Sequence, residues 1–127
     1  MKRDKDCMRD ILLDLEAEDE VDGNGTSFDP FVLEERFRPK WNSKQLSYNM
    51  AQLLDAGFVQ GKRDQTGGYY IVMISHQGHE FLDAVRDIAI WDQAKSGAKT
   101  SGTYALSLIW EVARSLVLAE VKAKLGL

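Results

Sequence analysis

Residues 43–59 read SKQLSYNMAQLLDAGFV, and this stretch decides how the rest of the chain is interpreted. Apolar side chains recur at positions 46, 50, 53 and 54, which is the spacing of one helix face. Ser43 is a suitable N-cap for such a helix, and Gly57 is a suitable C-terminal stop. The stretch therefore predicts an amphipathic helix over residues 44–56.

The other face of this helix is polar. It is expected to carry amide and phenol side chains beside one lysine, namely Lys44, Gln45, Tyr48, Asn49 and Gln52. Asn and Gln can pair with adenine in the major groove, into which a helix fits. These five are our candidates for reading DNA. Any surface helix is also polar on its outer side, so the pattern alone permits both interpretations.

A β-hairpin is predicted directly after the helix. Phe58-Val59 begins one short strand, and residues 69–74 (YYIVMI) have the β-branched and aromatic side chains that strands favour. Residues 64–68 (DQTGG) between them have the composition of a turn. The near arm of the hairpin carries Lys62 and Arg63.

Asp29-Pro30 precedes the helix and has the composition of a helix start. Phe31, Leu33 and Phe37 are expected to point inward from a short helix that ends before Pro39. The same side chains are also compatible with an extended segment, so the pattern permits both a short helix and an extended conformation.

Helical periodicity marks both ends of the chain. Residues 3–17 predict an amphipathic helix followed by an acidic, glycine-containing loop over 18–26. Ser75 is expected to cap a helix that runs to about Ala94, followed by a loop over 95–102. A final helix over 103–124 is apolar on most sides, so it is expected to be buried on more than one side. The predicted fold class is α+β and mostly helical.

Length and composition indicate the number of domains and the expected location of the protein. A chain of 127 residues fits one domain, here divided into residues 1–94 and a C-terminal loop and helix over 95–127 that form one unit with it. Cys7 is the single cysteine, and no apolar run of about 18 residues could span a bilayer. The expected location is the cytoplasm, with no membrane contact.

The net charge of -4 is unevenly distributed. Residues 1–37 hold 5 Lys/Arg and 12 Asp/Glu, whereas residues 38–63 hold five cations against Asp55 alone. The five cations are Arg38, Lys40, Lys44, Lys62 and Arg63. If all five contacted phosphates, log affinity for DNA would fall with log salt at a slope of about -4 to -5.

Two resemblances follow from these residues. A capped helix ending in LLDAGFV (residues 53–59) with a hairpin after it resembles a winged helix-turn-helix domain, whose recognition helix precedes its two-stranded wing. Residues 74–82 (ISHQGHEFL) are similar to the exit from such a wing. More closely, the chain resembles the domain-of-unknown-function 2513 family of bacteria and prophages, through MKRD (1–4), ILL (11–13), LSYNMAQLLDAG (46–57), GHEFLDAVRD (78–87) and Trp91. This resemblance implies a phage or mobile-element context rather than a mechanism.

The function expected from these patterns is a non-enzymatic regulator that binds double-stranded DNA. No nucleophile-base pair can be assembled. His76 and His79 share a helix face, but with Glu80 they match neither H-E-x-x-H nor H-x-x-E-H, and no further ligand is evident, so no cofactor or metal is expected. Cys7 is interpreted as a structural thiol. The competing class is an adaptor that binds another protein through its acidic surface and through exposed Tyr48 and Trp41. Salt dependence distinguishes the two classes.

The last helix has more apolar surface than one small core requires, which favours a homodimer. The alternative is that this surface packs within the monomer. The predicted dimer interface consists of Leu106, Ile109, Trp110, Ala113, Leu116, Val117 and Val121.

Overall fold

The computed structural model describes residues 1–102 and 104–127. These residues divide into two compact units, Met1–His79 and Glu80–Leu127, and each is described by itself. The α+β, mostly helical class expected from the sequence is confirmed. The elements, in chain order, are α1 (Lys5–Ala17), β1 (Thr26–Phe28), α2 (Pro30–Phe37), α3 (Ser43–Asp55), β2 (Val59–Arg63), β3 (Tyr69–Ile74), α4 (His76–Val85), α5 (Ile88–Thr100) and α6 (Leu106–Leu125).

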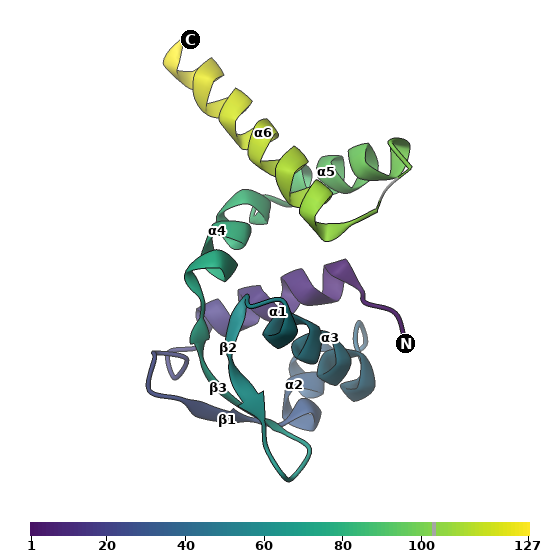
Figure 1. Cartoon of the computed structure of the whole chain (residues 1–127), viewed down its shortest axis with the longest axis vertical. Helices are drawn as coiled ribbons and strands as arrows, with labels where there is room; N and C mark the ends of the chain where they lie inside the picture. The colour runs from purple at the N-terminus through teal and green to yellow at the C-terminus, as the bar shows by residue number, and fades with distance from the viewer. Residues whose placement is uncertain (103) are drawn as a thin grey trace. The chain divides into compact units, whose positions relative to one another are not determined.

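The first unit contains a three-stranded antiparallel sheet with the strand order β1-β3-β2 (Figure 1). The hairpin β2-β3 was predicted, and its turn is fixed by Asp64, whose carboxylate accepts from the backbone N–H groups of Thr66 and Gly68. Strand β1 was not predicted, because three residues are too few to show an alternating pattern. The order helix, strand, helix, helix, hairpin is compatible with a winged-helix arrangement.

Apolar side chains from three helices and the sheet form the core of this unit. The inward faces of α1 and α3 are fully buried, and Leu33 of α2 and Ile71 of β3 join them. Burying each such side chain contributes about 1.5–3 kcal/mol. The buried residues of the two helix faces are Cys7, Met8, Ile11, Leu12 and Leu15 on α1 and Leu46, Met50 and Leu53 on α3.

Helix α2 confirms the helical reading of Asp29-Pro30, since the Asp29 carboxylate accepts from the Phe31 N–H at 2.8 Å. The expectation that Phe31 points inward is wrong, because its side chain is 69% exposed whereas Leu33 is buried. Residues 31 and 33 lie about 200° apart around a helix, so they cannot share the inner face. Phe37, one turn after Leu33, is half-buried.

The second unit differs from the sequence prediction at two points. A break at residues 86–87 separates α4 from α5, where the Asp87 carboxylate caps the new helix by accepting from the Ala89 and Ile90 N–H groups. Residues 95–100 continue α5 and are not a loop, because Ala94 and Ala98 extend its buried face. The predicted division between residues 94 and 95 therefore falls inside a helix.

Helix α6 packs against α5, and its fully buried residues all lie in its first half (Figure 1). Leu106, Ile109 and Ala113 are buried, whereas every residue from Leu118 onward is exposed. The expectation that this helix is buried on more than one side is wrong for its C-terminal half. No helix of the described chain has the length and apolar character required to cross a membrane.

Candidate nucleic-acid interface

Helix α3 presents a polar strip to solvent, and Lys44, Tyr48 and Gln52 lie on it as predicted. Lys44 is exposed, and Tyr48 and Gln52 are half-buried. Gln45 lies at the edge of the strip and has another role, because its side-chain oxygen accepts from the Asn42 N–H at 3.0 Å. The Asn42 side chain in turn accepts from the Gln45 N–H, so Asn42 is the N-cap and the prediction of Ser43 is off by one residue.

Asn49 is not on the exposed strip, which corrects the sequence prediction. It is 1% exposed, its Oδ1 accepts from the Asp4 N–H at 2.9 Å, and its Nδ2 donates to the Gln45 carbonyl at 2.8 Å. Asn49 lies three residues after Leu46 and four before Leu53, so helix geometry places it on the core side. Its amide joins the start of α1 to α3 and cannot read a base.

Ser47 also contributes to the polar side of α3, although it was not among the residues predicted from the sequence. Its Oγ lies 3.0 Å from the Tyr69 hydroxyl and accepts from Arg63 Nη2 at 3.1 Å. Arg63 Nε also donates to the Tyr69 hydroxyl at 3.2 Å. These contacts connect the end of β2 directly to the exposed side of α3. Ser47 follows Lys44 by three residues, and that spacing was the only sign in the sequence.

Two of the five predicted phosphate-binding cations already have carboxylate partners. Arg38 lies 3.2 Å from Glu34, and Lys40 lies 2.8 Å from Asp10. Among the described residues, no carboxylate pairs with Lys44, Lys62 or Arg63. All five side chains are exposed. Of the five, the cations available for phosphate without breaking an ion pair are thus Lys44 on α3 and Lys62 and Arg63 at the end of β2.

Trp41 was expected to be exposed, and it is not. Its side chain is 9% exposed and its Nε1 donates to the Asp10 carboxylate at 2.9 Å. Lys40, bound to the same carboxylate, lies over the Trp41 ring at 5.5 Å from the centroid. Asp10 of α1 therefore fixes the segment between α2 and α3, and Trp41 is not available to a protein partner.

Glu34 fixes the angle between α2 and α3. Its carboxylate accepts from the Ser43 N–H at 2.7 Å and from Arg38 at 3.2 Å. The hydrogen bond from the Ser43 backbone, together with the one from the Arg38 side chain, lowers the pKa of Glu34 below its ordinary value. A depressed carboxyl pKa means that this contact is intact at neutral pH and is lost only as the pH falls through that pKa.

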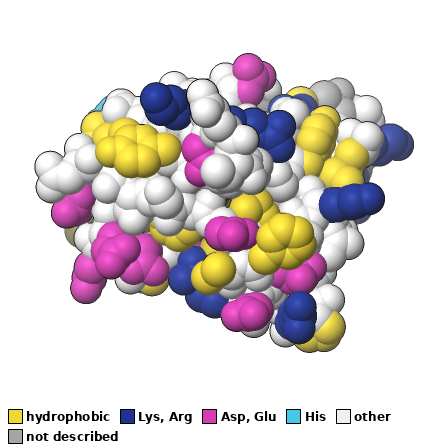
Figure 2. Space-filling view, turned by 90° about the horizontal axis from the view of Figure 1, so that it is seen from below, with side chains coloured by type: hydrophobic (Ala, Val, Ile, Leu, Met, Phe, Trp, Pro, Cys, Tyr) yellow, Lys and Arg dark blue, Asp and Glu magenta, His cyan; other side chains and the backbone are white. Residues whose placement is uncertain are grey.

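Charge on the wing side of the molecule is mixed. Figure 2 shows Lys and Arg side chains interspersed with Asp and Glu side chains over the face seen there. An interface of this kind permits a few placed phosphate contacts and disfavours indiscriminate attraction of polyanions.

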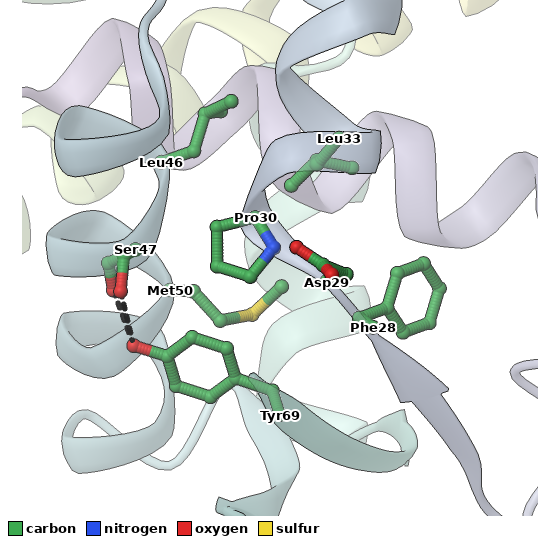
Figure 3. A pocket seen from close by; sticks show the side chains of 8 residues that line it. All are labelled: Phe28, Asp29, Pro30, Leu33, Leu46, Ser47, Met50 and Tyr69. Carbon is green, nitrogen blue, oxygen red and sulfur yellow. Dashed lines mark hydrogen bonds between the residues drawn. The ribbon is translucent and has the colours of Figure 1, made fainter. Parts of the chain in front are cut away.

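A small pocket lies beneath the polar strip. Its lining side chains come from β1, α2, α3 and β3, with the Tyr69 ring reaching across to Ser47 (Figure 3). The cavity volume is about 10 Å³. That is room for about one water molecule. The pocket is a packing feature between helix and wing, too small for an organic effector.

The remaining candidates for chemistry are unremarkable in their surroundings. Cys7 is fully buried, and burial, with a smaller contribution from Asp4, raises the pKa of its thiol to about 12. His76 and His79 are exposed in the first turn of α4. Within residues 1–102 and 104–127, no three His, Cys, Asp or Glu side chains are grouped so that they could hold a metal ion.

The predicted dimer interface on α6 is only partly accessible. Leu106, Ile109 and Ala113 are buried within the chain and cannot bind a second copy. Trp110 packs edge-on against Phe81 at 5.6 Å between ring centroids. The rest of the predicted set is Leu116 and Val117, which are half-buried, and Val121, which is 46% exposed; Leu118 and Leu125 are 55% and 67% exposed and were not predicted.

The fold and this strip define an α+β domain with a winged-helix-compatible first unit. The chain belongs to the family described as "Hypothetical protein (DUF2513)", whose model matches residues 2–104. The family resemblance noted in the sequence is thereby confirmed. A Haemophilus influenzae protein described as "Uncharacterized protein" is 30% identical over 122 residues, which cover 92% of this chain and 96% of the relative. No solved structure matches the chain.

Proposed function

We propose that this protein is a non-enzymatic DNA-binding regulator, encoded by a phage or another mobile element and acting in the cytoplasm. The observation that supports it most is the bond between Arg63 and Ser47, which joins the wing to the exposed side of α3. A recognition helix and a wing that form one surface can bind duplex DNA together, with the helix in the major groove and the wing against the backbone.

The structure revises which side chains carry this role. Gln52 and Tyr48 are the candidates for base contacts, because they lie on the exposed strip of α3. Lys44, Lys62 and Arg63 are the candidates for phosphate contacts. Asn49 and Gln45 are withdrawn from base reading, since their side chains are used within the protein.

The number of available cations sets the expected salt dependence. With three phosphate contacts, log affinity falls with log salt at a slope of about -2 to -3, shallower than the slope expected for five. Lys44→Gln should reduce that slope by about 0.9. Lys122→Gln is the matched control, because it removes an exposed cation at the end of α6 and should leave the slope unchanged. Fluorescence anisotropy with short duplexes at several salt concentrations measures both; equal slopes in Lys44→Gln and wild type would contradict this assignment.

A homodimer joined by the exposed half of α6 would place two reading helices on a two-fold site. Val121→Glu should then raise the dimer dissociation constant at least about 100-fold, because an unpaired charge is costly in an apolar interface. Ala119→Glu makes the same charge change about 200° away around the helix and should have little effect. Sedimentation equilibrium compares the three proteins. A wild-type protein that remains monomeric at high concentration would overturn the dimer.

A protein-binding adaptor remains the second candidate, favoured now by a different surface. Phe31 and Val32 at the start of α2 are 69% and 56% exposed. Two adjacent exposed apolar side chains suit the apolar centre of a protein interface. Binding through them would depend little on salt, whereas DNA binding weakens as salt rises.

A further inference from the structure

The guanidinium of Arg63 is held by one of its edges. Nε donates to the Tyr69 hydroxyl and Nη2 donates to Ser47 Oγ, at 3.2 and 3.1 Å. The guanidinium carbon also lies 5.4 Å from the centroid of the Tyr69 ring. A guanidinium has five N–H donors in a planar fork. Two of them are used here, so both donors of Nη1 and one of Nη2 are left for another partner.

The protons of this group can be placed from its distances. The Tyr69 hydroxyl donates to the Ser47 carbonyl at 2.6 Å, so its single proton is used. The contact of 3.0 Å between the two hydroxyls is therefore made by Ser47 Oγ donating to the Tyr69 oxygen. Each hydroxyl oxygen then accepts one N–H of Arg63. Tyr69 is 1% exposed, and its ring is fixed in the packing between β3 and α3 (Figure 3).

We propose that Ser47 and Tyr69 are positioning residues that hold Arg63 as a preformed seat for one phosphate of duplex DNA, where the wing meets α3. The seat rests on the proposed function and specifies its phosphate contact. The free N–H groups suit the two oxygens of a phosphate, which arginine binds through parallel hydrogen bonds. Lys44 lies one turn before Ser47 and adds a second cation on the same side of the helix.

Preorganisation is what the two hydroxyls contribute. A flexible arginine loses rotamer freedom when it binds, whereas an anchored arginine has lost it already on folding. Removing the anchors should therefore weaken binding without changing the number of charges. Losing the charge itself should weaken binding and also change the salt slope. The two effects separate a positioning role from a charge role.

The test measures duplex binding by wild type, Ser47→Ala, Tyr69→Phe and Arg63→Lys over a range of salt. Each variant keeps the positive charge at residue 63 but loses part of the arrangement that holds it. Each should therefore bind about 2- to 10-fold more weakly, as expected for freeing one flexible side chain. Their salt slopes should equal that of wild type. Lys62→Gln, which removes a neighbouring exposed cation, is the control and should lower the slope by about 0.9. Circular dichroism melting of Ser47→Ala and Tyr69→Phe verifies that both are folded.

The NMR signal of the Arg63 Nε–H provides a readout that does not require DNA. It should exchange slowly with solvent in wild type and rapidly in Tyr69→Phe. Unchanged affinity of Ser47→Ala and Tyr69→Phe would overturn the seat and leave DNA binding standing. Wild type that binds no duplex would overturn both proposals, and a shift of the Arg63 signal by inorganic phosphate in that case would assign the group to a free anion instead.

Discussion

Asn49→Ala should lower the free energy of unfolding by about 2–4 kcal/mol. Its amide makes two hydrogen bonds in a site that is 1% exposed, so truncation leaves the Asp4 N–H without its acceptor and the Gln45 carbonyl without that donor. The start of α1 then loses its attachment to α3. Urea unfolding followed by circular dichroism measures the change.

Gln52→Ala is the control for this variant, since Gln52 lies on the exposed strip of the same helix. Its stability should stay within about 0.5 kcal/mol of wild type. Equal stability of Asn49→Ala and wild type would show that the amide is not the connection described. Weaker DNA binding by Asn49→Ala is to be read as an effect on folding, whereas weaker binding by Gln52→Ala indicates base reading.

Phe81→Ala should lower the free energy of unfolding by more than Asn49→Ala does, by about 3–5 kcal/mol. Phe81 is fully buried, and its ring packs edge-on against Trp91 at 6.2 Å and Trp110 at 5.6 Å between centroids. The substitution removes both ring contacts and leaves a cavity. Thermal unfolding followed by tryptophan fluorescence reports on this cluster, because two of its three rings are tryptophans.

Ile88→Ala serves as the comparison in the second unit, because Ile88 is 58% exposed at the start of α5. Its melting temperature should be close to that of wild type. A Phe81→Ala protein that melts together with Ile88→Ala would show that the contacts of Phe81 with Trp91 and Trp110 do not stabilise this unit. Phe81→Leu should fall between the two, since it refills part of the cavity.

Most of the fold could be predicted from local patterns in the sequence. The spacing of apolar residues predicted α1 and α3, because each of these helices has one face in the core. The β-branched and aromatic composition of residues 69–74 and the turn residues before them predicted the hairpin. Strand β1 was missed because it exists only through its pairing with β3, which lies over 40 residues later in the chain. The extension of α5 through residues 95–100 was missed because glycine and serine there suggested a loop.

The candidate site was less predictable, because ion pairs and buried amides depend on distant residues. Lys40 is paired by Asp10, and Asn49 is buried by the start of α1, and neither neighbour is near in sequence. The burial of Asn49 did have a local sign, since it is spaced with Leu46 and Leu53 on one helix face. The anchoring of Arg63 by Ser47 had no sign beyond the place of Ser47 on the strip.

The proposed binding of duplex DNA by α3 and the wing can be measured directly. The most direct test titrates the wild-type protein against a pool of short duplexes, including the region upstream of its own coding sequence, at two salt concentrations. We expect saturable binding whose log affinity falls with log salt at a slope of about -2 to -3. Absence of binding at the lower salt concentration would contradict DNA binding and would favour a protein partner that contacts Phe31 and Val32.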